Sequence, residues 1–272
     1  PVAGLEPSNI GGAIVARATL HNEDEIRRKD SRIQESVLVV RSGKVIPKVI
    51  KVIKKKRDGS EIECKMPRKC PVCAHPVQRE KQDRSYINRC VNLSCEAQIK
   101  ERLRHFISKK ALNIDGFGKK MVDRFVDEGL VTSFADIFRL QKDQLSGLER
   151  FAEKSARNLI DSVNGSKNIS LQRFIYALGI SHTGEHAARV ISEAFGGLDN
   201  IMAASKDELK AIHGIGAETA TAVYDFFKNI EHGRVIADIL DQGVVIEKPK
   251  PVDGPSTDTV FNGKRIVLTG IL

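Results

Sequence analysis

The sequence predicts a multidomain α+β protein in which a small β-barrel, a four-cysteine zinc module and an all-helical domain follow one another along the chain. Three observations support this prediction. The 272 residues exceed the usual size of a single domain. Short β-branched runs fill the first quarter of the chain, whereas helical periodicity dominates the later part. Four of the five cysteines cluster within 26 residues between these two parts.

The first 67 residues predict the β domain. Short runs rich in Val and Ile are separated by Gly, Pro and charged clusters, a pattern typical of a small barrel. The predicted strands cover residues 13–18, 36–41, 45–53 and 61–66. Residues 41–69 hold eleven Lys and Arg against three acids, interspersed with apolar residues. Such a basic strand face is either a solvated outer surface or a surface that follows phosphates, and the charge run alone leaves both open.

Four cysteines have the spacing of a structural zinc site. Cys70 and Cys73 form a Cys-x2-Cys pair, and sixteen residues later Cys90 and Cys95 form a Cys-x4-Cys pair. Two such pairs bring four thiolates to the tetrahedral corners that Zn²⁺ prefers and leave no position for water, so we expect a structural ion. The alternatives are two disulfides or unrelated core cysteines, which a reducing compartment disfavours. Cys64 lies in a strand-like run, and we expect it to be an ordinary core residue.

From residue 97 onward the pattern becomes helical. Ile99, Leu103, Phe106 and Ile107 follow the i, i+4, i+7, i+8 spacing of one helix face, and similar stripes continue to about residue 240. Residues 247–260 hold three prolines among polar residues and predict a linker. The strand-like run at residues 261–272 then predicts the start of another domain.

One motif recurs four times in the helical part. Gly116-Phe117-Gly118 and Gly214-Ile215-Gly216 each join a short helix to an amphipathic one, and weaker copies lie at residues 149–152 and 181–184. The second glycine position of the four copies is occupied by Gly118, Ala152, Gly184 and Gly216, at spacings of 34, 32 and 32 residues. A regular period indicates one helix-hairpin-helix unit used four times.

A Gly-hydrophobic-Gly turn between two helices can bind the backbone of a nucleic acid. Its glycines let a phosphate approach, and the backbone N–H groups that begin the second helix bind the phosphate oxygens, without reading sequence. We expect the DNA-binding positions to be Gly116, Gly118, Ala152, Gly184, Gly214 and Gly216. In the second and third copies, Arg150 or His182 replaces a glycine, so there the side chain contacts phosphate or the hairpin only packs.

The charge supports a polyanionic partner. There are 44 Lys and Arg against 35 Asp and Glu, which gives a formal charge of +9. His182, His186 and His213 lie near the hairpins, but no ligand spacing indicates a metal site or a general base there. No apolar run reaches the roughly 20 residues of a membrane span, and no signal peptide is recognisable, so we expect a cytoplasmic protein. The absence of an initial Met and the strand-like last residues suggest a segment of a larger protein.

Residues 56–59 match the Lys-x-Asp-Gly signature of nucleotidyl transferases, whose lysine attacks a nucleotide phosphate. Here the match lies between two predicted strands, where Asp-Gly is the expected hairpin turn. A solvated lysine in a loop has nothing to activate it. We therefore interpret Lys56 as a turn residue and not as a nucleophile.

Taken together, these features resemble the C-terminal two-thirds of bacterial NAD-dependent DNA ligases. The stretches at residues 1–7, 17–22 and 41–47 resemble the OB domain of that family, although Lys44 stands where the family usually has Asp. The four cysteines resemble its zinc finger, the four repeats its helix-hairpin-helix domain, and residues 262–270 the first strand of its BRCT domain. The resemblance implies that Arg41, Val45 and Ile46 contact DNA near the nick.

The same resemblance implies domain boundaries and an activity. The domains would be an OB fold at 1–67, a zinc finger at 68–96, four helix-hairpin-helix units at 97–246, a linker at 247–260 and a truncated BRCT domain at 261–272. The full-length enzyme would use NAD⁺ and Mg²⁺ to seal nicks in duplex DNA during replication and repair, through a lysine in an upstream adenylation domain. This segment, a monomer, would bind nicked DNA without sequence preference and would not ligate alone.

Two other functions fit parts of the sequence. The first is a non-catalytic helix-hairpin-helix protein that binds junctions or damaged DNA; it predicts that no adenylation domain precedes Pro1. The second is an accessory domain of a zinc-ribbon nuclease or topoisomerase, which would need a carboxylate cluster or a tyrosine nucleophile. The three tyrosines stand in no recognisable motif.

Overall fold

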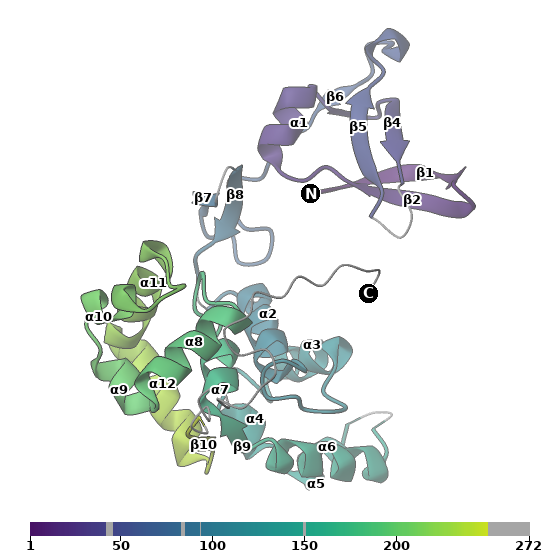
Figure 1. The fold of residues 1–272 in the computed structure, drawn as a ribbon. Helices are drawn as coiled ribbons and strands as arrows, with labels where there is room; N and C mark the ends of the chain where they lie inside the picture. Colours follow the sequence, from purple (N-terminus) through teal and green to yellow (C-terminus); the bar gives the residue numbers. More distant parts are fainter. Residues whose placement is uncertain (42–45, 83–84, 93, 149–150, 250–272) are drawn as a thin grey trace, which may run out of the picture. The chain divides into compact units, whose positions relative to one another are not determined.

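A computed structural model describes residues 1–41, 46–82, 85–92, 94–148 and 151–249. The chain divides into two compact units, Pro1–Gln98 and Ile99–Leu272, and each is described here by itself (Figure 1). The first unit holds the β domain and the cysteine module, and the second is almost entirely helical. The expected Val45, the linker from residue 250 and the expected BRCT strand lie outside the described residues. Among the helices that are described, none has the length and apolar character to cross a membrane.

The β domain is built on a curled four-stranded sheet. Its strands are β1 (Val2–Ile10), β2 (Ala13–Thr19), β4 (Val37–Val40) and β5 (Lys48–Val52). The order is β1-β2-β5-β4, antiparallel except for one parallel pairing between β2 and β5. The β1–β2 turn has Gly11 and Gly12 at φ 59° and 77°, a left-handed conformation that glycine adopts without a steric penalty. The predicted small β domain is confirmed, as a half-barrel within the described residues.

Short elements complete this domain. They are α1 (Glu23–Lys29), β3 (Arg32–Ile33), η1 (Lys54–Lys56) and β6 (Ile62–Glu63), with β3 paired to β6. The predicted strands at 13–18, 36–41 and 45–53 correspond to β2, β4 and β5. The predicted strand at 61–66 was too long, since only Ile62–Glu63 pairs. Strand β1 and helix α1 were not predicted.

Helix α1 begins and ends with local signals. The side chain of Asn22 accepts a hydrogen bond of 2.9 Å from the Glu25 backbone N–H, as an N-cap does. Acidic residues occupy the first turn and basic residues the last, which suits the helix dipole. Ile26 is buried, as are Val15, Ala18 and Val49 of the same domain.

The cysteine module is a hairpin of β7 (Val77–Gln82) and β8 (Ser85–Cys90), which contacts α1. The contact is polar: Arg79 forms an ion pair with Asp24, and the Asn88 side chain donates a 2.8 Å hydrogen bond to Glu23. The Arg79 guanidinium also lies 4.3 Å from the centre of the Tyr86 ring. The hairpin is therefore held to the β domain by charges more than by apolar burial.

The second unit consists of helices around one apolar core. The helices are α2 (Glu96–Ile107), α3 (Lys119–Asp127), α4 (Asp136–Arg139), α5 (Lys142–Ser146), α6 (Glu153–Gly165), α7 (Leu171–Ala177), α8 (Glu185–Phe195), α9 (Leu198–Ala203), α10 (Lys206–Ala211), α11 (Ala217–Lys228) and α12 (Ile230–Asp241). A small parallel pair joins β9 (Asn168–Ser170) to β10 (Val245–Glu247). Phe106, Phe125, Phe174 and Ile191 are fully buried in a core that extends from Leu103 to Val244. The predicted helical domain is confirmed.

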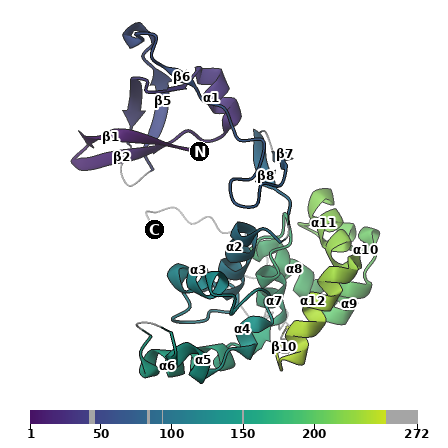
Figure 2. The same cartoon turned by 180° about the vertical axis from the view of Figure 1, so that it is seen from behind.

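The four repeats are four helix pairs: α2 with α3, α5 with α6, α7 with α8, and α10 with α11. Figure 1 and the reverse view in Figure 2 show α5 and α6 at one end of the unit and α10 and α11 at the other. Phe125 in α3 lies against Phe117 of the first hairpin and Phe151 of the second, at ring-centroid distances of 5.3 and 6.3 Å. Phe117 and Phe151 thus anchor the first two turns to the core.

Candidate metal centre and nucleic-acid interface

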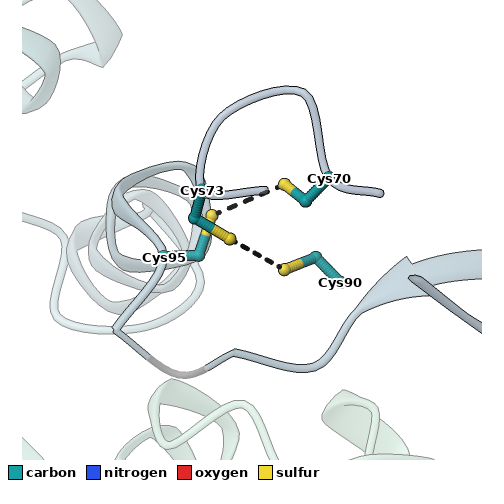
Figure 3. A group of neighbouring side chains, drawn as sticks. All are labelled: Cys70, Cys73, Cys90 and Cys95. Carbon is teal, nitrogen blue, oxygen red and sulfur yellow. Dashed lines mark hydrogen bonds between the residues drawn. The ribbon is translucent and has the colours of Figure 1, made fainter. Parts of the chain in front are cut away.

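The four predicted cysteines lie together. The sulfur atoms of Cys70, Cys73, Cys90 and Cys95 are all within 4.8 Å of one another, and the four side chains point toward one centre (Figure 3). Two of the Sγ–Sγ distances are 3.9 Å (Cys70 to Cys95) and 3.6 Å (Cys73 to Cys90). A disulfide needs about 2.05 Å, and all four thiols are free. The disulfide alternative is therefore wrong, and the cluster could hold a metal ion.

The distances between the sulfur atoms fit a tetrahedral metal site with four sulfur ligands. In a tetrahedral site with metal–sulfur bonds of about 2.3 Å, the sulfurs lie about 3.8 Å apart, which matches the two distances given above. Backbone turns set this geometry: Ala74 N–H donates to the Cys70 carbonyl at 2.9 Å, and Ser94 N–H donates to the Asn92 side chain at 3.0 Å. The two Cys pairs are thus arranged by their own turns.

The thiols have strongly divergent pKa values. The backbone N–H of His75, together with the Asn92 side chain, lowers the pKa of Cys73 to about 6. At Cys90 the backbone N–H of Asn92 favours the thiolate, but burial and the neighbouring thiols outweigh it and raise the pKa to about 12. Four thiolates this close repel one another, so they ionise together only around a cation. The donor set therefore fits a bound metal ion.

Cys64 stands apart from the cluster. It is half-buried and lies just after the short β6, outside any strand. The expectation that it is an ordinary core residue was wrong, because β6 ends at Glu63, three residues before the end of the predicted strand. Its separation from the other four thiols makes it a useful control for metal binding.

The hairpins share one backbone conformation. At the first glycine position, Gly116 and Gly214 have φ of 80° and 87°, and His182 has φ of 60° in the third copy. This left-handed region favours glycine, so His182 adopts the same turn at a steric cost. At the second position, Gly118, Ala152, Gly184 and Gly216 are all extended N-caps, with φ between −66° and −81°. Arg150 lies outside the described residues.

Each N-cap leaves the start of its helix accessible. None of the four has a side chain that caps the helix, and all four positions are exposed. A Cβ built at Gly116, Gly118, Gly184 or Gly216 would meet nothing within 4 Å. The residue between the two positions is buried instead, as Phe117, Thr183 and Ile215 show. Backbone N–H groups at these helix starts therefore face open space in which an anion fits.

Two of the helix starts carry an acid that a distant lysine neutralises. Glu153 begins α6 and pairs with Lys142, whereas Glu185 begins α8 and pairs with Lys110. Lys142 lowers the pKa of Glu153, and Glu185 raises the pKa of Lys110. Pairing reduces the repulsion that a free carboxylate would exert on a phosphate. Neither pair was predicted from the sequence. Lys110 and Glu185 are 75 residues apart, so no local pattern indicates that they form an ion pair.

The histidines near the hairpins belong to no group of three or more possible metal ligands among the described residues. Within the residues that the structure describes, the four cysteines are the one group at ligand distance. The carbonyl of His182 accepts a hydrogen bond of 3.2 Å from Thr219, and a Cβ at Gly214 would lie 3.6 Å from the His186 ring. The third and fourth hairpins are therefore neighbours.

The β-domain residues predicted to contact DNA are exposed in part. Ile46 is 71% exposed, and Arg41 is half-buried. On β5, Val49 is fully buried while Lys48 and Lys51 are exposed. Lys51 pairs with Leu38 and Val49 with Val39, so Ile50 is an unpaired bulge residue. This bulge places both lysines on the exposed side of the strand.

The Lys-x-Asp-Gly match lies in an exposed turn between β5 and β6, but not in the expected hairpin, because β6 pairs with β3 and β5 with β2 and β4. Lys56 is exposed at the end of η1, and Gly59 has φ of 94°. Asp58 accepts a hydrogen bond of 2.9 Å from Ser60 N–H, which closes the turn. Arg57 points the other way, into an ion-pair network with Asp30 and the almost fully buried Glu35.

The fold and the cysteine cluster define a class of protein that combines an OB-type β domain with a metal-binding module and tandem helix-hairpin-helix units. Comparison with known families supports both the OB-type β domain and the helix-hairpin-helix units. The NAD-dependent DNA ligase OB-fold domain matches residues 1–61. A SAM-like helix-hairpin-helix tandem matches residues 108–164, which contain the first two hairpins, and a helix-hairpin-helix motif matches residues 173–236, which contain the other two.

Curated relatives carry the comparison over the whole chain. The chain is 48% identical over 274 residues to a DNA ligase of Desulforapulum autotrophicum, 45% identical over 273 residues to one of Desulfosudis oleivorans, and 43% identical over 274 residues to one of Bacillus cereus. Each match covers 100% of this chain and 40 or 41% of the relative. The predicted resemblance is confirmed: over its whole length the chain is similar to part of bacterial DNA ligases, and residues 1–61 match the OB-fold domain of the NAD-dependent ones. The part it spans is smaller than the predicted two-thirds. A non-catalytic DNA-binding protein is not favoured.

Proposed function

We propose that this chain is the part of an NAD-dependent DNA ligase that grips nicked duplex DNA. The observation that carries the proposal is the repeated hairpin: four helix starts with the same N-cap conformation, exposed and uncapped by any side chain. Backbone N–H groups in this arrangement bind phosphate oxygens and read no base edges, so binding would be independent of sequence. The net charge of +9 supports the same partner.

The residues have separate parts in this function. Gly116, Gly118, Gly184, Gly214, Gly216 and Ala152 would admit phosphates to the helix starts. In the β domain, the exposed Ile46, with Arg41 and Val45, would contact the duplex near the nick. Holding both DNA strands on either side of a break keeps the 3′-hydroxyl and 5′-phosphate in line, which lowers the entropic barrier to joining them.

The bound metal at the cysteine cluster is proposed to be Zn²⁺. Four sulfur donors at tetrahedral spacing suit zinc, and a site filled by four thiolates has no open position for catalysis. Cys70, Cys73, Cys90 and Cys95 would hold it and thereby order a module too small to fold on its own. NAD⁺ and Mg²⁺ are proposed for the complete ligase, in the part of its length that this chain does not span.

The proposed organisation follows the predicted boundaries. It comprises an OB fold at 1–67, a zinc finger at 68–96, helix-hairpin-helix units at 97–246, a linker at 247–260 and a BRCT strand at 261–272. Within a bacterial cytoplasm the ligase would act as a monomer in replication and repair. Lys56 would take no part in adenylation, since it lies on an exposed turn.

Binding of nicked duplex, measured at several salt concentrations, tests the proposal. The Gly118→Val/Gly216→Val variant adds side chains in open space at two helix starts without requiring a positive φ. We expect at least a tenfold loss of affinity and a shallower salt dependence, because phosphate contacts are lost. Gly233→Val, a matched change on α12 with open space around it, should bind as the unmodified chain does.

Two outcomes would contradict the proposal. The first is affinity of the unmodified chain that does not fall as salt rises, because phosphate binding releases counterions. The second is a double hairpin variant that folds normally by circular dichroism and still binds nicked DNA as tightly as Gly233→Val does.

A further inference from the structure

A hollow in the β domain is lined by four lysines. It has a volume of about 390 Å³ and lies where the end of β5 leads into η1. We call it the lysine hollow; its lining residues are Lys29, Lys51, Lys54, Lys55, Val52 and Ile53. The half-buried Val52 and Ile53 provide apolar walls. Four ammonium groups around such a small volume repel one another unless anions accompany them.

Acidic side chains compensate only two of these lysines. Lys29 donates a 2.7 Å hydrogen bond to the Val49 carbonyl and forms an ion pair of 3.1 Å with Glu25. Lys54 forms an ion pair of 3.0 Å with Asp30. The side chains of Lys51 and Lys55 have no hydrogen-bond or ion-pair partner among the residues that the structure describes. Two uncompensated positive charges therefore remain beside an apolar wall, where water screens them less than on an open surface.

The hollow continues a line of positive charge along β5. The bulge at Ile50 keeps Lys48 and Lys51 on the exposed side of the strand, and Lys55 follows at its end. Because Ile50 is a bulge, Lys48 and Lys51 lie opposite Val40 and Leu38, two residues apart on β4, which is roughly 7 Å. One strand of duplex DNA rises by the same amount over about two nucleotides, each with one phosphate. The spacing of Lys48 and Lys51 therefore suits a DNA strand that runs along β5.

We infer that the lysine hollow binds backbone phosphates of the DNA that the ligase grips, several nucleotides away from the contact made by Ile46. This inference rests on the proposed function and extends the contact of the β domain with DNA from the loop before β5 to the turn after it. Lys51 and Lys55 bind the phosphates, whereas Lys29 and Lys54, fixed by Glu25 and Asp30, shape the hollow and add to its potential. A free polyphosphate has the same charged groups, so the test has to separate the two sources.

The test uses the whole chain and nicked duplex DNA. Lys51→Gln/Lys55→Gln removes the two uncompensated charges. Each phosphate contact contributes about 0.9 to the slope of log affinity against log salt. We therefore expect the slope to decrease by about 1.8 and the affinity at low salt to fall by roughly tenfold. The matched control, Arg27→Gln/Lys65→Gln, removes two charges from exposed positions outside the hollow and should change the slope little.

Three results would overturn the inference. If Lys51→Gln/Lys55→Gln and the control have equal slopes while the hairpin variant loses affinity, the hollow does not bind DNA and the proposed function stands. If calorimetry shows that inorganic pyrophosphate binds the unmodified chain, that Lys51→Gln/Lys55→Gln abolishes this binding, and that DNA affinity is unchanged, the hollow is a site for a small anion. If the unmodified chain does not bind DNA, the proposed function fails as well.

Discussion

The two compact units are stabilised in different ways. In the first, the buried apolar side chains that the structure describes are few, and ion pairs and the cysteine cluster add to the connections made by strand pairing. In the second, one continuous apolar core connects every helix pair from Leu103 to Val244. A unit of about 100 residues with a small core depends on additional cross-links, whereas a larger core is sufficient by itself. The comparison shows that metal and core are alternative means of ordering parts of one chain.

Removal of the metal ion should reveal the largest difference between the two units. We expect Cys90→Ser to lose the metal ion and the protection of residues 68–98 from hydrogen exchange, while the helices beyond α2 keep theirs. The effect should be large, since structural zinc contributes on the order of 10 kcal/mol of apparent binding energy in small modules. Metal content by mass spectrometry and hydrogen exchange measure it. Cys64→Ser is the control, and equal metal content in the two variants would contradict the assignment.

A substitution in the core of the second unit should lower the stability of that unit without affecting the metal content. Phe125 is fully buried between the first two hairpins, so Phe125→Ala leaves a cavity there. We expect the free energy of unfolding of the helical unit to fall by about 3–5 kcal/mol, with metal content unchanged. Urea unfolding followed by circular dichroism measures the change. Ile230→Ala, at a 72% exposed site, should cost almost nothing; a similar loss in both variants would argue against a single apolar core.

Arg173 connects two distant segments of the helical unit by hydrogen bonds. Arg173 donates hydrogen bonds of 2.8 and 3.0 Å to the carbonyls of Ala111 and Lys109, in the chain before the first hairpin. Arg173→Met should lower the free energy of unfolding by about 2 kcal/mol, because hydrogen bonds from charged donors are lost. The exposed Arg157, whose ion pair with Glu153 is 3.9 Å long, is the matched control. Equal unfolding midpoints for Arg173→Met and Arg157→Met would show that this connection is dispensable.

The smallest effect should come from the strained turn in the third hairpin. His182 has φ of 60° where two other hairpins have glycine. His182→Gly should raise the free energy of unfolding by roughly 0.5 kcal/mol, as relief of left-handed strain exceeds the entropy that glycine adds to the unfolded chain. Gly116→His, the reverse exchange in the first hairpin, should destabilise the unit. Thermal melts of both variants measure the two changes in stability. If both variants are stabilised, or both destabilised, the two turns are not equivalent.

The sequence predicted those features in which chemistry depends on spacing. Cys70, Cys73, Cys90 and Cys95 are found together because thiolate geometry limits the number of residues between ligands. The hairpins are found at their period because each turn needs an anchoring residue such as Phe117 between two open positions. Even the third copy, which appeared degenerate, keeps the shared turn, since histidine tolerates a positive φ at a modest cost.

Features that depend on tertiary pairing were not predictable in the same way. Strand β1 is interrupted by Gly4 and Pro7 and shows no apolar alternation, so only its pairing with β2 reveals it. Helix α1 is only seven residues long, so it has little helical periodicity. Asn22, followed by acidic and then basic residues, is nevertheless a sequence pattern that indicates a helix. The bulge at Ile50, which gathers Lys48 and Lys51 on one side, follows from the register with β4 and not from the local sequence.

The repetition of one open helix start at four places has a kinetic consequence. A ligand held at several equivalent points can leave one of them while the others retain it, so that the freed point rebinds at a high effective concentration. On a uniform polymer such as duplex DNA, the proposed partner, this arrangement would let the protein shift by small steps without dissociating. Individually weak turns would thereby combine a long residence time with one-dimensional movement toward a break.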